Sequence, residues 1–414
     1  MRILTGRAAE SAVAKLAARA SRLDTIEPRV RRIVRCVRRE GDRALLRYAT
    51  LWDSVAKGQP LRVSPEELAQ AWKSSPLETR DALKRAAASI RRFARRQVPR
   101  SWRRKVDGAE LGQLVRPLES VGCYVPGGRY PLPSTLLMTV IPAQVAGVER
   151  IAVVTPRPQA ATLAAAWLLG INEVYRFGGA QAIAALAYGT ETVARVDKIV
   201  GPGNAYVTSA KKLVCSDCAI DMLAGPTEAV VYSEKGNAEF LASDLVAQAE
   251  HDPDALVLFI STDGKLTKNV AANVQRAMRG NAIAARAVKR NAYALVAASC
   301  EQAMEWVNCI APEHLTVDDD SAVAMVQNAG SVFVGSYSPQ AAGDYAAGPN
   351  HVLPTAGAAR FRGGLSAADF VKVITVQSFS RDALRRVASV VTTLAGTEGL
   401  RAHAQSVRVR CGDA

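Results

Sequence analysis

The sequence predicts an α/β protein with two parallel-sheet domains and helical extensions at both ends of the chain. Hydrophobic residues make up 49% and charged residues 22% of the 414 positions, which is ordinary for a globular chain with a sizeable core. From about Val121, short β-rich runs alternate with helical runs, as they do in βαβ units. No apolar run approaches the roughly 18 to 20 residues of a membrane-spanning helix, so we expect no membrane partner.

The first hundred residues predict helices. From Arg2 to Arg104, apolar residues recur every three or four positions among arginine-rich faces, and nothing there is typical of a parallel strand. A turn near Gly58 divides this region, and Ser64 followed by Glu67 is a capping-box helix start. The N-terminus lacks the apolar core of a signal peptide, so we expect a cytoplasmic location.

Two sets of strands are expected in the middle of the chain. In the first set, each strand is followed by an Ala-rich helical segment, and helices of roughly ten to fifteen residues between strands indicate a parallel sheet. The tail is helical from Ser380 and ends in a short β-like stretch at 407–409. The expected strands are 150–155, 173–177 and 198–200 in the first set, and 228–232, 256–262 and 331–334 in the second.

The formal net charge of +15 is unevenly distributed. Residues 1–105 hold 27 Lys and Arg against 10 Asp and Glu, so the basic excess belongs to the N-terminal quarter. A nucleic-acid partner is the alternative that this excess raises. Aromatic residues are sparse there and no nucleic-acid motif is present, so we interpret the excess as solvated helical faces and expect no nucleic-acid partner. Seven scattered cysteines indicate a reducing compartment rather than a disulfide framework.

Three glycine-rich turns, at 122–128, 178–181 and 201–204, fall between a predicted strand and a predicted helix. Backbone N–H groups at such turns bind anionic ligands, so three turns in one domain favour a cofactor crevice at the carboxyl ends of the strands. None matches the G-x-G-x-x-G dinucleotide pattern. A tight βα turn without a ligand is the alternative interpretation of any one of them.

The histidines lie in polar segments near carboxylates. Gln248 and His251 are three residues apart near the end of a helix that starts near Asn237, so both project from one face. Together with Asp344 they would suit Zn²⁺, which accepts imidazole and oxygen ligands. An ordinary polar helix end is the alternative. The C-x-x-C pair at 215–218 has no second pair and is a weak metal or redox candidate.

Two further segments carry acid/base groups. Glu313 directly precedes His314, which places a carboxylate beside an imidazole. Asp344 and His351 share a loop punctuated by glycine and proline, where functional residues often lie. A buried, hydrogen-bonded histidine is the alternative interpretation of both.

As a set, these residues resemble the histidinol dehydrogenase family over nearly the whole chain, from Arg43 to Arg410. The most specific match is the stretch 220–228 followed by 243–251. Further matches are 121–128, 199–208, 311–315, 343–355 and 398–403. Three positions depart from the usual pattern: Leu223 replaces a common Pro, Thr227 a usual Ser, and Ala347 a frequent Ser.

The resemblance implies NAD-dependent oxidation of L-histidinol through L-histidinal to L-histidine, the last step of histidine biosynthesis. It implies a homodimer with one Zn²⁺ per subunit and two Rossmann-like domains that lack the complete dinucleotide fingerprint. The implied domains are a helical arm over 1–23, a first Rossmann-like domain over 24–124 and 227–360 with the zinc and catalytic residues, a second over 125–226 on the NAD side, and a helical tail over 365–414 that reaches the partner subunit.

The resemblance also implies roles for single residues. Zinc would be bound by Gln248, His251, Asp344 and His403, and NAD would contact Tyr124, Gln181 and Asn204. Glu313 and His314 would be the catalytic acid/base pair. The substrate would contact Thr227, Gln248, His251, His314, Asp344, His351, Glu398 and His403, of which Glu398 and His403 would come from the partner subunit's tail.

These roles fit the chemistry of the two oxidations. With an unperturbed pKa near 6.5, His314 would be neutral at pH 7 and could accept the hydroxyl proton as hydride leaves. Glu313 could then deprotonate the water that hydrates the aldehyde. A zinc- and NAD-dependent dehydrogenase of another polar alcohol, from the same superfamily, is the alternative function.

Overall fold

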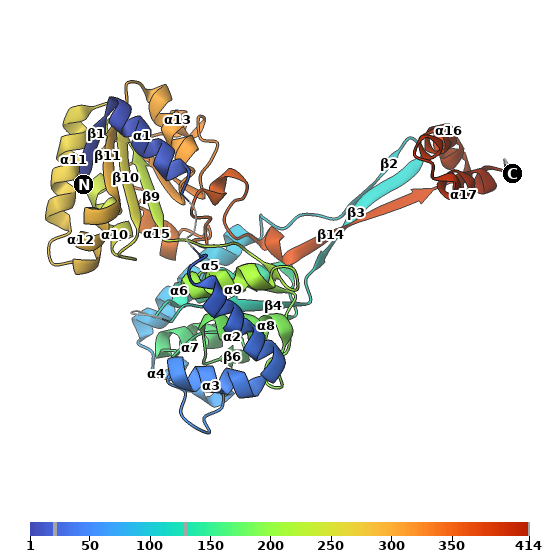
Figure 1. Ribbon diagram of the computed structural model, residues 1–414, viewed down its shortest axis with the longest axis horizontal. Helices are drawn as coiled ribbons and strands as arrows, with labels where there is room; N and C mark the ends of the chain where they lie inside the picture. The colour runs from blue at the N-terminus through green and yellow to red at the C-terminus, as the bar shows by residue number, and fades with distance from the viewer. Residues whose placement is uncertain (20–22, 128–130, 413–414) are drawn as a thin grey trace.

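The computed structural model describes residues 1–19, 23–127 and 131–412. Figure 1 shows two α/β bodies, one above the other, and a long arm that carries the C-terminus far from both. We call these parts the six-stranded domain, the five-stranded domain and the arm. No helix in the described part of the chain has the length and apolar character needed to cross a membrane.

The six-stranded domain is built on a fully parallel sheet with the order β1-β11-β10-β9-β12-β13. Side chains alternate between its faces: Val230 packs toward α1 and α13, and Val231 packs toward α10, α11 and α12. The strands are β1 (Arg2–Thr5), β9 (Glu228–Tyr232), β10 (Leu256–Ser261), β11 (Ala292–Val296), β12 (His314–Val317) and β13 (Ser331–Val334). The helices are α1 (Gly6–Ala17), α10 (Ala238–Ala249), α11 (Gly264–Ala277), α12 (Ala282–Asn291), α13 (Cys300–Ile310), α14 (Asp320–Val323) and α15 (Gln340–Tyr345).

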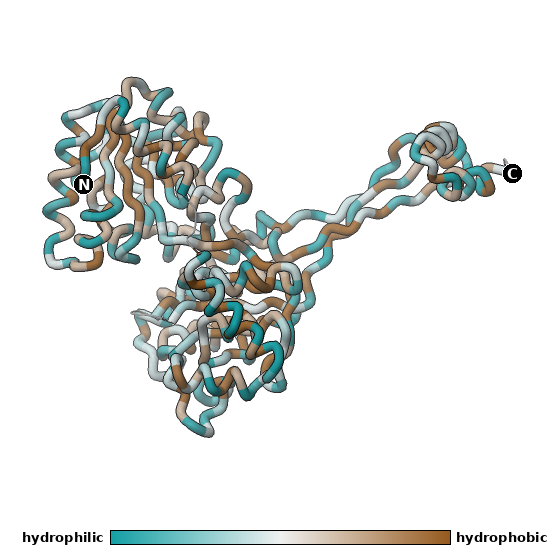
Figure 2. The backbone as a smooth tube through the Cα atoms, viewed as in Figure 1, coloured by the Kyte–Doolittle hydropathy of each residue, from teal (hydrophilic) through white to brown (hydrophobic). Residues whose placement is uncertain are grey.

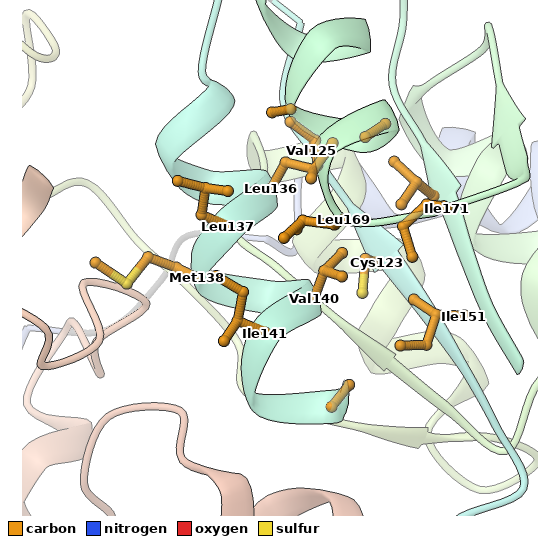
Figure 3. Close-up of a cluster of buried hydrophobic side chains, with 14 of the residues drawn as sticks. Cys123, Val125, Leu136, Leu137, Met138, Val140, Ile141, Ile151, Leu169 and Ile171 are labelled. Carbon is orange, nitrogen blue, oxygen red and sulfur yellow. The ribbon is translucent and has the colours of Figure 1, made fainter. Parts of the chain in front are cut away.

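The five-stranded domain has a parallel sheet with the order β6-β5-β4-β7-β8. Helices α4 to α7 cover one face, where Figure 3 shows side chains of α6 packed against Cys123 and Ile151 of the sheet. Helices α2, α3, α8 and α9 cover the other face. The strands are β4 (Ser120–Tyr124), β5 (Arg150–Val154), β6 (Glu173–Tyr175), β7 (Lys198–Val200) and β8 (Ala219–Ile220). The helices are α2 (Glu27–Glu40), α3 (Asp42–Trp52), α4 (Pro65–Ser74), α5 (Leu77–Ala94), α6 (Pro133–Ala146), α7 (Ala160–Leu168), α8 (Gly179–Tyr188) and α9 (Ala205–Val214).

The arm is a three-stranded antiparallel ribbon with two helices at its tip. Strand β3 (Ala109–Pro117) pairs along its whole length with β14 (Val371–Phe379), and on its other side with β2 (Trp102–Val106). The short 3₁₀ turns η1 (Ala358–Arg360) and η2 (Ala367–Phe370) precede β14, and α16 (Arg381–Thr397) and α17 (Arg401–Cys411) follow it. Figure 2 shows hydrophobic stretches along this ribbon, away from both domain cores.

Both sheets follow the same chain order. In the five-stranded sheet, β5 and then β6 lie on one side of β4, and β7 and then β8 lie on its other side. In the second sheet β9, β10 and β11 run outward, and β12 and β13 lie beyond β9. The chain connections therefore leave in opposite directions on either side of the gap between β4 and β7, and likewise between β9 and β12. Such switch points leave a crevice at the carboxyl ends of parallel strands.

The structure corrects the expected division of the chain. The expected helical arm over 1–23 is wrong for residues 1–19, because β1 pairs with β11 and α1 packs against α13. The helices α2 to α5 do not join the domain that contains 227–360, since they pack on the five-stranded sheet. An amphipathic pattern indicates that a helix buries one face, but it does not say which sheet that face covers.

At the level of elements, the expected strands are present, with ends that differ by up to two residues. Ser64 and Glu67 form the expected capping box, and α16 begins after Ser380. The β-like end at 407–409 is wrong, because these residues lie in α17. The expectation of no parallel strand before Arg104 is also wrong, because β1 is one. The expected ranges do not include β2, β3, β4, β8, β11, β12 and β14.

Candidate functional site

A cavity of about 200 Å³ lies between the two domains. The six-stranded domain contributes the amino ends of β9 and β12, and the five-stranded domain contributes the start of α6 and the loop after β7. The expected site residues that line it are Thr227, Gln248, His251, Glu313, His314, Asp344 and His351. These residues come from five separate segments of the chain, so the fold brings them together.

Glu313 lines this cavity, and one of its carboxylate oxygens is held by hydrogen bonds. Its Oε2 accepts hydrogen bonds from Thr227 Oγ1 at 2.7 Å and from the backbone N–H of Glu228 at 2.8 Å. Thr227 Oγ1 in turn accepts a hydrogen bond from the Gln248 amide. Burial raises the pKa of Glu313 to about 7, although His314 and both hydrogen bonds oppose the rise. The carboxyl group can therefore take up or release a proton near neutral pH.

The His314 ring lies between two carboxylates. Its Nδ1 is 3.7 Å from Glu313 Oε2 and 3.3 Å from the carbonyl oxygen of Glu228, and its Nε2 is 3.6 Å from Asp344 Oδ1. Burial alone would lower the pKa of His314, but Glu313 and Asp344 outweigh it and raise the pKa above its ordinary value. The expectation based on an unperturbed pKa is therefore wrong: the ring holds its proton more firmly than a free histidine.

The buried Nε2 of His314 has no hydrogen-bond partner among the described residues. It points toward the same cavity that Asp344 and His251 line. Burial opposes ionisation of Asp344, but His314 lowers the pKa of its carboxyl group below the ordinary value. A buried nitrogen and an ionised carboxylate left facing a cavity indicate that a polar ligand completes the site.

His351 joins the two domains at the edge of the cavity. Its Nδ1 is 2.9 Å from the backbone oxygen of Asp344, and its Nε2 is 3.4 Å from Thr135 Oγ1 on α6. Burial lowers its pKa, which favours the neutral ring. The structure thus places His351 in the cavity wall, where its neutral ring can bridge two polar groups.

The expected zinc ligands are only partly together in one chain. Gln248, His251 and Asp344 line the cavity, and His251 lies just beyond the C-terminal end of α10. His403 lies on α17 and Glu398 at the end of α16, both exposed at the tip of the arm in Figure 1. No three His, Cys, Asp or Glu residues gather as a metal-binding group within the described ranges of this chain. An amide oxygen, an imidazole and a carboxylate are suitable but incomplete ligands for Zn²⁺.

The two cysteines of the C-x-x-C pair, a weak metal or redox candidate, lie in different environments. Cys218 is buried and Cys215 is exposed, and both are free thiols. Burial raises the pKa of Cys218 to about 11, so this thiol is protonated near neutral pH.

A second cavity, of about 360 Å³, lies at the carboxyl ends of β4 to β7. All three residues expected to contact NAD, Tyr124, Gln181 and Asn204, line it. The Tyr124 hydroxyl accepts a hydrogen bond from Gly179 N at 3.1 Å, and Asn204 caps α9. Pro202, two residues before Asn204, lines the first cavity, so one loop borders both.

A buried ion pair anchors that shared loop. Lys211 Nζ is 2.6 Å from Asp221 Oδ1 and donates to the carbonyl oxygen of Gly201 at 2.5 Å. The other oxygen of Asp221 accepts a hydrogen bond from Gly201 N at 2.7 Å. Both charged side chains are almost completely buried. The loop between the two cavities is therefore fixed to the segment that leads into the six-stranded domain.

The equivalent crevice in the six-stranded sheet is filled by the protein itself. Asp318, after β12, accepts hydrogen bonds from Ser233 Oγ at 2.6 Å, Glu234 N at 2.7 Å and Lys235 N at 3.2 Å. Backbone N–H groups at this place in a parallel sheet are the ones that bind phosphates. Only about 20 Å³ remains beside Asp318. The five-stranded domain therefore offers the larger space for a cofactor.

Sequence reasoning missed several residues of both cavities. Thr135 in the first cavity and Asp53 in the second come from helical segments with no distinguishing signal. Arg157 lies two residues after the expected strand 150–155 and could have been found from that position. Glu228, whose backbone contacts both Glu313 and His314, lies inside the stretch 220–228, but the resemblance implies no role for it. Gly128, in the first glycine-rich turn, lies outside the described residues.

Comparisons with known proteins give one consistent result. The family model described as Histidinol dehydrogenase matches residues 16–411. A histidinol dehydrogenase of Haloarcula marismortui is 48% identical over 94% of this chain and 94% of its own length. One of Methanothermobacter thermautotrophicus is 45% identical over 92% of each chain. The crystal structure of histidinol dehydrogenase from Elizabethkingia anophelis, 35% identical, matches with a TM-score of 0.93 and covers 99% of this chain and 98% of that one.

Proposed function

The chain belongs to the histidinol dehydrogenase family of oxidoreductases, and from this premise we propose that it oxidises L-histidinol through L-histidinal to L-histidine with NAD⁺ as hydride acceptor. One observation carries the catalytic part of the proposal. Glu313 and His314 lie side by side, buried in a cavity between the domains, and their pKa values are both raised. Two neighbouring groups that can each accept a proton suit two successive oxidations.

We propose that both domains are Rossmann-like. The shared strand order supports this, because in each sheet the first three strands run outward and the next two lie on the other side of the first. The second cavity, at the switch point of the five-stranded sheet, is then the site of NAD. Tyr124, Gln181 and Asn204 are its proposed contacts.

One Zn²⁺ per subunit is proposed to bind Gln248, His251 and Asp344 of one chain and His403 of the partner subunit. The unpartnered His314 Nε2 and the ionised Asp344 support a polar ligand here. When bound, the metal would orient the substrate, since histidinol offers an imidazole and an amine as neutral nitrogen ligands. Residues of the chain carry out the proton transfers.

In the first oxidation, His314 accepts the hydroxyl proton while hydride leaves the same carbon for NAD⁺, which gives the aldehyde and NADH. The neighbouring Glu313 and Asp344 make the ring a stronger base, because they stabilise its protonated form. The ring must first be neutral, so its raised pKa moves this step to higher pH. Glu313 and Asp344 also flank the ring, at 3.7 Å from Nδ1 and 3.6 Å from Nε2.

In the second oxidation, Glu313 removes a proton from the water that adds to the aldehyde, and the hydrate then loses hydride, for which a second NAD⁺ would be the acceptor. Thr227 and the Glu228 backbone hold Glu313 Oε2, which leaves the other carboxylate oxygen without a hydrogen bond from these groups. The burial of the cavity also keeps the aldehyde from side reactions between the two steps.

We propose a homodimer in which each arm completes the partner's site. Glu398 and His403 of one chain would then contact the substrate and the metal in the site of the partner subunit. The arm supports this, because its exposed apolar residues have no core of their own to join. These residues are Trp102, Val106, Val373, Ile374, Phe379, Val390, Leu394, Leu400 and Val409. The free cysteines suit the proposed cytoplasmic location.

The experiment is a stoichiometric assay with the purified full-length protein, L-histidinol, NAD⁺ and Zn²⁺. We expect two NADH per L-histidinol consumed, loss of activity after chelation, and recovery on adding Zn²⁺. Activity with other polar alcohols and none with L-histidinol would support the alternative substrate. Activity that survives exhaustive chelation and metal analysis would overturn the zinc assignment.

A further inference from the structure

We propose that Lys211 and Asp221 are positioning residues for hydride transfer: this buried ion pair fixes the loop at 201–204, which borders both cavities, and so sets how the bound cofactor faces the substrate. The inference rests on the proposed function, in which the first cavity binds L-histidinol and the second binds NAD⁺. Neither side chain is among the described residues that line the two cavities. Both act through the backbone segments that they hold.

The first argument is the reach of Lys211 along α9. Asn204 caps the start of this helix and lines the second cavity, and Lys211 lies about two turns further on. Side chains of a helix tilt toward its N-terminus, so Lys211 can reach back to the loop before the helix. Its Nζ donates to the carbonyl oxygen of Gly201 there, at 2.5 Å. The helix thereby holds the loop that leads into it.

Asp221 holds the same glycine through its backbone N–H. Its Oδ2 accepts a hydrogen bond from Gly201 N at 2.7 Å, and its Oδ1 accepts one from Met222 N at 2.5 Å and lies 2.6 Å from Lys211 Nζ. The ion pair thus binds both backbone polar groups of Gly201. On its other side, Gly201 lies so close to β4 that an added Cβ would be 2.1 Å from the backbone oxygen of Tyr124, which lines the second cavity. The loop is therefore held from both sides.

The segment that follows the ion pair leads into the first cavity. Met222 and Ala224 line this cavity, and the segment ends at Thr227, whose hydroxyl donates to Glu313. Thr208, also on α9, donates from its hydroxyl to the backbone oxygen of Ala224 at 3.0 Å. One helix therefore holds both the loop that borders the two cavities and the segment that leads to the proposed catalytic carboxyl group.

The burial of this pair indicates a role in geometry rather than in stability. The exposed fraction of the side chain is 3% for Lys211 and 0% for Asp221. Desolvation of two charges offsets most of their attraction, so apolar residues of similar volume often give equal or greater stability. The ion pair supplies direction instead, because it holds the N–H and the C=O of Gly201 at fixed places. A shift of about 1 Å between reacting groups can slow a reaction by about 10²-fold.

The alternative is that the pair only stabilises the fold, and a double substitution separates the two roles. Lys211→Met or Asp221→Leu alone leaves one buried charge without its partner, whereas Lys211→Met/Asp221→Leu removes both charges. We therefore expect the double variant to unfold at a higher urea concentration than either single variant. It still lacks both hydrogen bonds to Gly201. A purely stabilising role predicts that the reaction rate recovers with stability, and a positioning role predicts that the rate stays low.

The test is single-turnover formation of NADH by the full-length protein with Zn²⁺, at saturating NAD⁺ and with folded protein in excess over L-histidinol. The rate constant is then independent of the fraction of a variant that is folded. We expect Lys211→Met and the double variant to be about 10- to 100-fold slower than the wild type. Arg150→Met/Glu173→Leu is the matched control, because it removes an ion pair at the amino ends of β5 and β6, outside both cavity linings. This control should keep the wild-type rate.

L-Histidinol deuterated at the carbon that loses hydride identifies the slowed step. We expect a primary isotope effect on the rate of the double variant; a slow rate without one, or a wild-type rate, would overturn the inference while the proposed function stands. If circular dichroism shows that the double variant is unfolded, Asp221→Asn takes its place, since it keeps the shape but has one acceptor oxygen instead of two. The same outcomes then decide. No NADH formation by the wild-type protein would overturn the proposed function itself.

Discussion

Arg19 holds the carboxylate of Glu228 through two hydrogen bonds, Nε to Oε1 at 2.6 Å and Nη2 to Oε2 at 2.5 Å. The backbone of Glu228 contacts both members of the proposed acid/base pair: its N–H donates to Glu313 and its carbonyl oxygen faces His314 Nδ1. The Arg19 side chain thus supports the two catalytic groups from behind the sheet, without touching the cavity.

Replacing Arg19 by Met should therefore damage both stability and positioning. The change leaves Glu228 buried without its partner, which typically costs about 3 to 5 kcal/mol. We expect a lower midpoint in urea unfolding and a fall in kcat that exceeds the change in KM. Arg7→Met, on the exposed side of α1, is the matched control. The double variant Arg19→Met/Glu228→Met should recover much of the stability; if it is as unstable as Arg19→Met, the ion pair is not the cause.

Substitutions of the two proposed catalytic residues should slow different steps of the reaction. His314→Asn should lower the rate of the first oxidation by a factor on the order of 10² to 10⁴, the usual contribution of a general base. Glu313→Gln should retain more of the first oxidation than of histidine formation, because it removes the base for aldehyde hydration. Single-turnover measurements starting from L-histidinol and from L-histidinal separate the steps. Equal losses at both steps in both variants would contradict this division.

The pH dependence of aldehyde oxidation should follow Glu313. A general base works only when ionised, and burial raises the pKa of this carboxyl to about 7 from an ordinary value of 4.5. The rate should therefore rise with pH up to about 7 rather than level off near pH 5. The pH profile of kcat/KM for L-histidinal checks this, and Glu313→Gln should remove the rise. A wild-type rate that is already constant from pH 5 to pH 8 would exclude Glu313 as the base.

If each active site is shared between subunits, two inactive variants should complement one another. His314→Asn and His403→Ala are each expected to be inactive alone. After subunit exchange, one of the two sites in each mixed dimer has both residues intact, so an equimolar mixture should regain about one quarter of wild-type activity. Mixing two batches of the same variant is the control. No recovery, despite exchange verified by mass spectrometry, would show that His403 acts within its own chain or not at all.

Some elements of the fold could be predicted from local sequence signals, whereas the site could not. The strand at 228–232 and the helix that begins after Asn237 were predictable, because hydrophobic runs and cap residues are local signals. The gathering of Glu313, His314 and Asp344 in one cavity with Gln248 was anticipated from a family resemblance. Spacing alone left each of these residues with an ordinary structural explanation.

The errors concern contacts between distant segments. β1 looked helical because its four residues lead directly into α1, and its partner β11 lies almost 300 positions later. The helices α2 to α5 gave no sign of which sheet they cover. The raised pKa of His314 depends on Asp344 and Glu313 together, so no single segment could reveal it. Long-range pairing is the information that local patterns lack.

The pairing of β1 with β11 also has a consequence for how the chain acquires its structure during synthesis. All five strands of the five-stranded sheet have been synthesised once β8 has left the ribosome, but β1 has no partner until β11 emerges. At about 5 to 20 residues per second, the interval between the synthesis of β1 and that of β11 lasts roughly 15 to 60 seconds. For that time the β1 segment has no strand to pair with. A variant lacking residues 1–5 should therefore fold its five-stranded domain normally and expose the edge of β11 in the other, which makes that edge the expected origin of aggregation.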